Sequence, residues 1–210
     1  MAESVPDVHD RDEAEIEFGR IVAFSDGVFT IAITLLVLSL EIPPGGDLSE
    51  LLSERAEQFF AYFLSFAVTA RFWLAHHRFY GLVQRFDRRL VTLNFVYLSF
   101  VALLPFTTEL IGDYSDDPLG VAIYAGCLAI LSLAFLSQTY HAYGAGLVRE
   151  DALPYRRRFT GPPSWIGVII FGGSIPLALI SPTLAVLTWL LMFVAGRWVR
   201  DRASGLSAPG

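Results

Sequence analysis

Hydrophobic residues fall into six long runs, and the short segments between the runs hold most of the charged residues. A helix that crosses a hydrocarbon layer about 30 Å thick needs roughly 20 mostly apolar residues. The pattern therefore predicts an all-α, polytopic membrane protein with six transmembrane helices. The last two runs are short and are joined by Ser181-Pro182, which favours a tight hairpin. The six runs are Arg20–Ile42, Glu57–Phe79, Leu90–Ile111, Leu119–Tyr143, Ser164–Ile180 and Thr183–Val199.

Composition supports a membrane protein. Hydrophobic residues make up 54% of the chain, charged residues make up 17%, and the mean hydropathy is +0.51. A soluble domain usually has about 25% charged residues. A soluble α-helical protein is therefore disfavoured, and the lipid bilayer is an expected partner.

The distribution of arginine along the chain predicts its orientation in the membrane. All 15 basic residues are arginine, and 13 of them flank the runs on one side. Arg55 alone lies on the other side, while Arg71 is within the second run. Loops on the cytoplasmic side of membrane proteins carry an excess of positive charge. We therefore expect a multi-pass protein of the cell membrane whose N- and C-termini are both cytoplasmic.

The acidic residues concentrate at the N-terminus. The net charge is −6, but residues 1–17 alone hold seven acids and one arginine. Such a composition is typical of a solvated, disordered tail. We predict three parts: a disordered acidic cytoplasmic tail over residues 1–19, a six-helix transmembrane domain over residues 20–199, and a C-terminal cytoplasmic tail over residues 200–210.

Sequence signals of an enzyme are weak. The pair His76-His77 has no second histidine cluster to complete a metal centre, and no HExxH motif occurs. Ser25 lies in Phe-Ser-Asp-Gly rather than in GxSxG, and Cys127 has no nearby base. We therefore expect no catalytic residue, no cofactor, no metal site and no nucleic-acid partner.

Asp26 is the unusual residue of the first run. It lies six residues inside Arg20, and a carboxylate in the bilayer costs roughly 2.5–3.5 kcal/mol even on lenient scales. Such a residue needs partners, and three donors occur at similar depth in runs two and three. Trp73, His77 and Asn94 can each donate a hydrogen bond to the carboxylate. We predict a polar network that joins Ser25 and Asp26 to these three residues.

The same helix has a separate apolar stripe. At about 100° per residue, Gly27, Ile31, Leu35 and Leu38 share one face, with Thr34 at its border. Ser25 and Asp26 point to the other side. Two interpretations stay open at this point: the stripe contacts lipid, or it lines something.

These residues resemble a known family. The motif Arg20-x-x-x-Phe24-Ser25-Asp26 is similar to the signature of the transmembrane-protein-175 family of potassium channels. Further similar positions are Trp73, His76-His77, Phe79, Asn94 and Leu104-Pro105-Phe106. The similarity is detailed in the first three runs and covers all six in topology.

The resemblance implies more than the pattern does. Prokaryotic members hold one six-helix repeat and assemble as homotetramers, so the first helices of four copies would surround a central pore. The family constriction would fall at Ile31, Leu35 and Leu38, with Thr34 as a polar ring in some members. Arg20, Phe24, Ser25, Asp26, Trp73, His77 and Asn94 would form the structural network beside the pore.

We therefore expect a potassium-selective or potassium-preferring cation channel with a hydrophobic constriction formed by the first helix. The alternative is a proton-coupled secondary transporter that uses Asp26 and His77 as a relay. The lack of visible internal repeats and of a broken helix disfavours this transporter.

Overall fold

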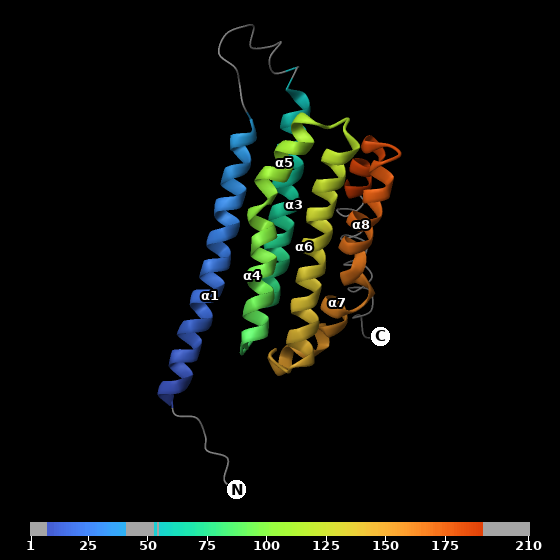
Figure 1. Ribbon diagram of the computed structural model, residues 1–210. Helices are drawn as coiled ribbons and strands as arrows, with labels where there is room; N and C mark the ends of the chain where they lie inside the picture. The colour runs from blue at the N-terminus through green and yellow to red at the C-terminus, as the bar shows by residue number, and fades with distance from the viewer. Residues whose placement is uncertain (1–7, 41–52, 54, 191–210) are drawn as a thin grey trace, which may run out of the picture.

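The computed structural model describes residues 8–40, 53 and 55–190, and these residues form a bundle of long helices (Figure 1). The helices are α1 (Val8–Leu35), α3 (Ala56–Tyr80), α4 (Arg88–Ala102), α5 (Leu104–Asp113), α6 (Pro118–Gly144), α7 (Arg156–Thr160) and α8 (Ile166–Ala178). Short 3-10 segments follow α1 at Leu36–Ser39 and flank α7 at Glu150–Tyr155 and Pro162–Trp165.

Four helical stretches are long and apolar enough to cross a membrane: Ile16–Ser39, Ala56–Tyr80, Arg88–Asp113 and Pro118–Gly144. A fifth arises if Glu150–Thr160 and Pro162–Ala178, which are bent by 50°, count as one span. Residues 182–190 begin another helix after a turn at Leu179-Ile180, and most of the sixth predicted run lies outside the described residues. The multi-pass helical fold is confirmed, while the count of six stays a prediction.

The start of α1 corrects the sequence-based expectation. The helix begins at Val8, whereas we predicted disorder through residue 19. Residues 12–17 read Asp-Glu-Ala-Glu-Ile-Glu, and glutamate and alanine are strong helix formers. These residues therefore favour a helix, and the structure describes helix from Val8 where the charge pattern suggested a disordered tail. Residues 1–7 and 200–210 of the two predicted tails lie outside the described residues.

The third span contains a break between α4 and α5. Helix α4 ends at Ala102 and α5 begins at Leu104, with Pro105 in its first turn. Proline lacks a backbone N–H and its ring collides with the carbonyl of the preceding turn, which interrupts a helix at this point. The chain nevertheless continues in the same general direction to Asp113 (Figure 1).

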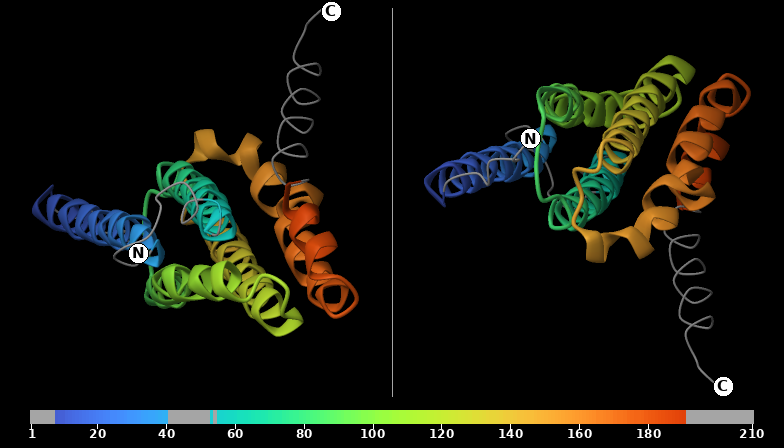
Figure 2. Two further views of the ribbon diagram at one scale, coloured as in Figure 1. Left: turned by 90° about the horizontal axis from the view of Figure 1, so that it is seen from above. Right: turned by 90° about the horizontal axis from the view of Figure 1, so that it is seen from below.

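Helix α6 lies at the centre of the bundle, between α1 at one edge and α8 at the other (Figure 2). It packs against α4, α5 and α8. Its buried residues include Tyr124, whose hydroxyl is 2.9 Å from the Ser65 hydroxyl of α3. A second interhelical bond joins Tyr80 of α3 to the Gln138 Oε1 atom of α6 at 2.9 Å. Polar pairs thus fix the register of α3 against α6.

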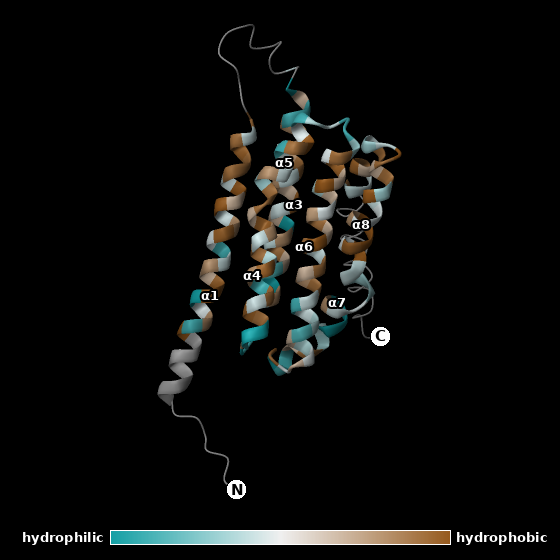
Figure 3. Cartoon of the chain, viewed as in Figure 1, coloured by the Kyte–Doolittle hydropathy of each residue, from teal (hydrophilic) through white to brown (hydrophobic). Residues whose placement is uncertain are grey.

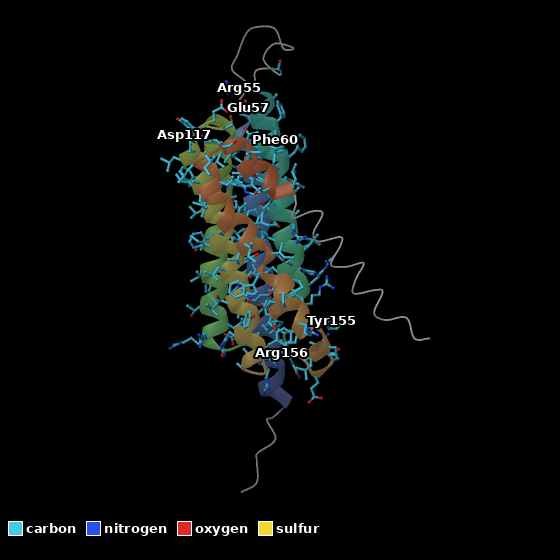
Figure 4. All side chains as sticks on the ribbon, turned by 90° about the vertical axis from the view of Figure 1, so that its right-hand side faces the viewer. Arg55, Glu57, Phe60, Asp117, Tyr155 and Arg156 are labelled. Carbon is cyan, nitrogen blue, oxygen red and sulfur yellow. The ribbon has the colours of Figure 1, made fainter. Side chains whose placement is uncertain are left out.

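Charged groups gather at the two ends of the bundle, and hydrophobic residues dominate the middle (Figure 3). Arg55 and Glu57 lie at one end, and Arg156 lies at the opposite end (Figure 4). The end of α3, the start of α4 and the end of α6 lie at the same end of the bundle as α7, which begins at Arg156 (Figure 1). The arginine-rich loops of the described residues therefore meet at one end, as the predicted alternation requires.

Candidate functional site

Helix α1 has two faces that differ in burial. Ser25, Phe29, Ala32 and Leu36 are buried, and their spacing of four, three and four residues places them on one side of the helix. This side packs on α3 and α4. The buried face therefore changes from polar at Ser25 to apolar from Phe29 onward.

The opposite face of α1 is apolar and exposed. Ile31 is 59% exposed, Leu35 is 41% exposed and Leu38 is 68% exposed. Thr34 is exposed on the same face, and its hydroxyl donates to the Ile31 carbonyl oxygen at 2.9 Å. Leu38 lies in a 3-10 turn, where a straight α-helical wheel no longer applies, yet it remains on the open side. We call Ile31, Thr34, Leu35 and Leu38 the open stripe.

A buried chain of hydrogen bonds ties α1 to α3 and α4. The Asn94 amide of α4 donates to the Ser25 hydroxyl oxygen at 2.8 Å, and the Asn94 carbonyl oxygen lies 2.9 Å from His76 Nε2. Because that oxygen is only an acceptor, His76 must donate from Nε2. The Ser25 hydroxyl in turn donates to the Ile21 carbonyl at 2.9 Å. Three helices are therefore joined by one amide side chain.

Aromatic rings enclose His76. Its ring stacks between Tyr80, at a centroid distance of 4.3 Å, and Tyr97, at 5.4 Å. Phe29 of α1 lies 5.7 Å away and contacts Tyr97 as well. His76 is fully buried. The imidazole is therefore held in one orientation by stacking, which fixes the direction of its hydrogen bond to Asn94.

Asp26 belongs to a separate contact. Its Oδ1 accepts a hydrogen bond from the Trp73 indole N–H at 2.9 Å. His77 stacks on Trp73 with a centroid distance of 5.3 Å and is exposed. The predicted pairing of Asp26 with Trp73 is therefore present, whereas Asn94 bonds Ser25 and not Asp26 among the described contacts.

The histidine of the buried hydrogen-bonded chain is His76, whereas His77, which we predicted for the network, stacks on Trp73 beside the Asp26 contact. The prediction used the local spacing of Trp73 and His77, which places them on one face of α3. The buried positions of α3 include Val68, Phe72, His76 and Phe79, which follow the helical repeat along the whole segment. That longer pattern is the signal that assigns His76 to the interior.

The other two predicted network residues lie at the edge of the site. Phe24 is half-exposed, and its ring packs on Phe95 of α4 at 5.7 Å. Arg20 is exposed on α1. These residues border the buried chain without joining it.

The remaining candidates for chemistry in the described part of the chain are metal-ligand clusters and the cysteine thiol. No group of three or more His, Cys, Asp or Glu residues there could hold a metal ion. Cys127 is buried, and its thiol faces the Phe100 carbonyl oxygen at 3.7 Å. The arrangement instead defines a multi-pass helical membrane protein whose first helix is fixed by polar contacts and exposes an apolar stripe.

Comparison with known proteins identifies the family. Residues 20–105 match the family model described as endosomal/lysosomal potassium channel TMEM175. A potassium channel of Streptomyces collinus is 34% identical over 180 residues, which cover 77% of this chain and 87% of that protein. The chain belongs to the TMEM175 family, which is a family of channels and not of enzymes.

A cyanobacterial relative extends the comparison to three dimensions. A potassium channel of Chamaesiphon minutus is 38% identical over 135 residues, which cover 60% of this chain and 66% of that protein. A crystal structure described as a lysosomal potassium-selective channel TMEM175 homolog from Chamaesiphon minutus superimposes with a TM-score of 0.77 at 30% identity. The superposition covers 86% of this chain and 96% of the other. The fold of this chain is therefore that of a TMEM175 channel.

Proposed function

We infer that this protein is a potassium channel, and we propose that four copies assemble around a pore lined by α1. The channel assignment follows from family membership and from bacterial relatives that are named potassium channels. The proposed assembly places the open stripe of each copy toward a common axis. The protein would then select potassium at rings formed by Ile31, Leu35 and Leu38, with Thr34 beside them.

The observation that carries this proposal is the exposure of the open stripe. The most apolar stretch of the first span has a mean hydropathy of 2.3, yet only 22% of that stretch is buried within the chain. The opposite face is held firmly by Ser25 and by apolar contacts. A helix fixed on one side and left apolar on the other is suited to meeting copies of itself.

Rings of apolar side chains can control the passage of ions by excluding water from the pore. A narrow hydrophobic constriction gates by losing its water, and an ion that passes it must shed part of its hydration shell. Potassium sheds water more readily than sodium, which gives a preference without carbonyl ligands. Ile31 is β-branched and therefore stiff at χ1, so we expect its ring to be the narrowest.

The buried hydrogen bonds have a positioning role in this proposal. Ser25, Asn94 and His76 face away from the open stripe and fix where α1 stands against α3 and α4. Asp26 with Trp73 adds a second tether one residue further along α1. None of these groups would contact the ion.

We propose that the arginine-rich end faces the cytoplasm and that the protein resides in the cell membrane. The arginines of the described loops meet at one end, which is the arrangement expected under the positive-inside rule. Both termini would then be cytoplasmic. The channel domain would comprise residues 20–199, as the hydrophobic runs indicate.

The rival carrier mechanism loses support from the geometry. A relay from Asp26 to His77 needs the two groups within reach of one another, but the described hydrogen bond of Asp26 goes to Trp73, and His77 stacks on that indole. Measurements of flux against concentration separate the two functions. A channel gives unitary conductance steps, whereas a carrier gives saturable, coupled flux.

Cysteine accessibility tests whether the open stripe lines water. Cys127 is buried and is the chain's one cysteine, so modification by a water-soluble reagent reports on an introduced thiol. Leu35→Cys, at a position 41% exposed, should be modified by a charged, water-soluble thiol reagent that then blocks potassium flux. Leu133→Cys on α6, at a position 47% exposed, is the matched control and should stay unmodified in lipid.

The oligomeric state is tested separately. Mass measurement of the purified protein in detergent should give four copies. A stable monomer or dimer that still conducts potassium would contradict the tetramer and leave the channel assignment intact. Modification of Leu133→Cys together with protection of Leu35→Cys would contradict the assigned pore face.

A further inference from the structure

A groove opens between α4 and α6 at the arginine-rich end of the bundle. Its volume is about 640 Å³. Helix α4 contributes Arg89 and Leu93, which are one turn apart on the same face. Helix α6 contributes Ser137, Tyr140, His141 and Gly144, which also repeat along one face. The channel function uses none of these six residues.

The groove lies at the expected boundary between hydrocarbon and water. The span of α4 begins at Arg88 and the span of α6 ends at Gly144. Leu93 and Ser137 therefore line the deeper part, and Arg89 and His141 line the outer part. A second hollow of about 390 Å³ lies on the other side of Tyr140 and includes Trp165. Tyrosine and tryptophan favour this depth because their rings are amphipathic.

Arg89 is the exposed cation at the outer part of the groove. Its guanidinium forms no ion pair within the described residues, where the acidic partners pair elsewhere: Asp87 with His141, and Asp151 with Arg149. The Asp87 carboxylate lies within the electrostatic reach of Arg89, but its hydrogen bonds go to other groups. It accepts from the Leu90 backbone N–H at 2.7 Å and bonds His141 Nε2 at 2.8 Å. The guanidinium therefore has donors available for another anion.

The other groups in the groove are already satisfied. The Ser137 hydroxyl donates to the Leu133 carbonyl at 2.8 Å. The Tyr140 hydroxyl donates to the Thr160 carbonyl and accepts from the Trp165 indole at 3.4 Å. The deeper walls thus present hydrocarbon and aromatic ring faces, and Arg89 supplies the positive charge at the outer part of the groove. Such a site matches a ligand with one anionic group and an attached apolar chain.

We propose that this groove binds an anionic phospholipid of the adjacent leaflet, with its phosphate on Arg89 and the start of an acyl chain along Leu93. Arginine binds phosphate through two parallel N–H donors. Basic pockets between transmembrane helices are suited to anionic headgroups. The orientation proposed above enters only in naming the leaflet as cytoplasmic.

The geometry favours a lipid over a free anion. A free phosphate would use Arg89 alone and leave the apolar depth of the groove open to lipid tails. A phospholipid fills both parts with one molecule, because its phosphate and its acyl chains are adjacent. Hydrophobic burial along Leu93 and the charge contact at Arg89 then act on the same ligand.

Lipid binding to the full-length protein in neutral detergent tests the proposal. Phosphatidylglycerol or phosphatidylcholine is titrated, and bound lipid is counted by native mass spectrometry. Arg89→Gln should weaken phosphatidylglycerol binding about fivefold, the effect of one arginine near an anionic surface. Arg88→Gln removes the neighbouring exposed arginine, which does not line the groove, and should change binding less than twofold.

A second variant fills the groove without changing charge. A side chain added at Gly144 meets open space, as does one added at Gly126 on the same helix. Gly144→Leu should reduce phosphatidylglycerol binding, and Gly126→Leu should not. This pair keeps the proposal testable if Arg89→Gln fails to fold.

Several outcomes overturn the proposal. Equal losses in Arg88→Gln and Arg89→Gln would indicate general surface charge instead of a site. Equal binding of phosphatidylcholine, or no loss in Gly144→Leu, would show that the groove does not select an anionic lipid. Displacement of phosphatidylglycerol by millimolar inorganic phosphate would identify a free-anion site.

Discussion

Helices α1 and α6 have the same hydropathy and opposite environments. The most apolar stretch of each span has a mean hydropathy of 2.3. In α6, 56% of that stretch is buried within the chain, whereas in the span that contains α1 only 22% is buried. Helix α6 lies at the centre of the bundle, and α1 lies at its edge (Figure 2). Hydropathy alone therefore does not indicate whether a helix is surrounded by protein, by lipid or by further copies of the chain.

The difference lies in how polar residues are used. In α6 they join the helix to α3 within the interior, as in the pair Tyr124 and Ser65. In α1 they occupy one side near one end, where Ser25 and Asp26 tether the helix to the bundle. The tether leaves the open stripe uncovered. Substitutions in α6 should therefore affect stability. Substitutions in α1 should affect stability at the tether and ion selectivity at the open stripe.

The largest expected effect is loss of the central amide. Asn94→Ala removes the partner of both Ser25 and His76, and unpaired buried polar groups are costly. We expect the free energy of unfolding to fall by roughly 2–4 kcal/mol, measured by thermal unfolding in detergent. Ser99→Ala on the same helix removes only a hydrogen bond to the Val96 carbonyl within α4 and should change the free energy of unfolding little. Equal effects of the two variants would refute the tether.

The second tether should matter less. Asp26→Ala leaves the Trp73 indole N–H without its acceptor, at a cost of about 1–2 kcal/mol. Asp26→Asn keeps an oxygen in place and should restore most of the stability. Selectivity for potassium should be unchanged in both, because Asp26 is off the open stripe. Normal assembly of Asp26→Ala with loss of potassium preference would mean that Asp26 faces the ion.

A matching change in α6 sharpens the comparison. Tyr124→Phe leaves the buried Ser65 hydroxyl without its partner, and we expect a loss of about 1 kcal/mol. Ion flux and selectivity should stay at wild-type values, because this pair is remote from the open stripe. Tyr114→Phe at an exposed position is the control. A change in selectivity in Tyr124→Phe would remove the distinction between the two helices.

The smallest expected effect concerns pH. Burial opposes ionisation of Asp87, but the hydrogen bonds from Leu90 and His141 outweigh it and hold the pKa of this carboxyl below its ordinary value. The carboxylate therefore stabilises the folded state above about pH 4, and this contribution is lost as the pH falls through the lowered pKa. Asp87→Asn should cost no more than about 0.5 kcal/mol between pH 5 and 7. The difference from wild type should shrink as the pH falls below about 4, and thermal unfolding measured from pH 7 down through that region checks it.

Sequence patterns predicted the long spans because span length and hydropathy are set by the bilayer itself. Four predicted runs coincide with helical stretches to within a few residues. The start of α1 was missed because charge indicated a solvated tail, while the same residues also favour a helix. A water-exposed helix and a disordered acidic tail differ little in composition.

The polar site was predicted in part for a related reason. Asp26 and Trp73 could be paired because both are costly in lipid and lie at similar depth. The choice between His76 and His77 depends on which side of α3 meets α4, and adjacent residues differ by about 100° around a helix. Packing of the whole helix, with Tyr80 and Tyr97 against His76, settles that rotation, and the local Trp73–His77 spacing does not.

The central claim is that the open stripe of α1 faces the ion path, and one flux measurement tests it most directly. Wild-type protein and two variants are reconstituted in liposomes, and potassium and sodium fluxes are compared under equal gradients. Ile31→Asn replaces a stiff apolar ring by a polar one, so sodium flux should rise relative to potassium without loss of total conductance. Thr30→Asn, about 100° around the helix and bonded to the Asp26 carbonyl, should keep the wild-type ratio. A wild-type ratio in Ile31→Asn with an altered ratio in Thr30→Asn would contradict the assigned pore face.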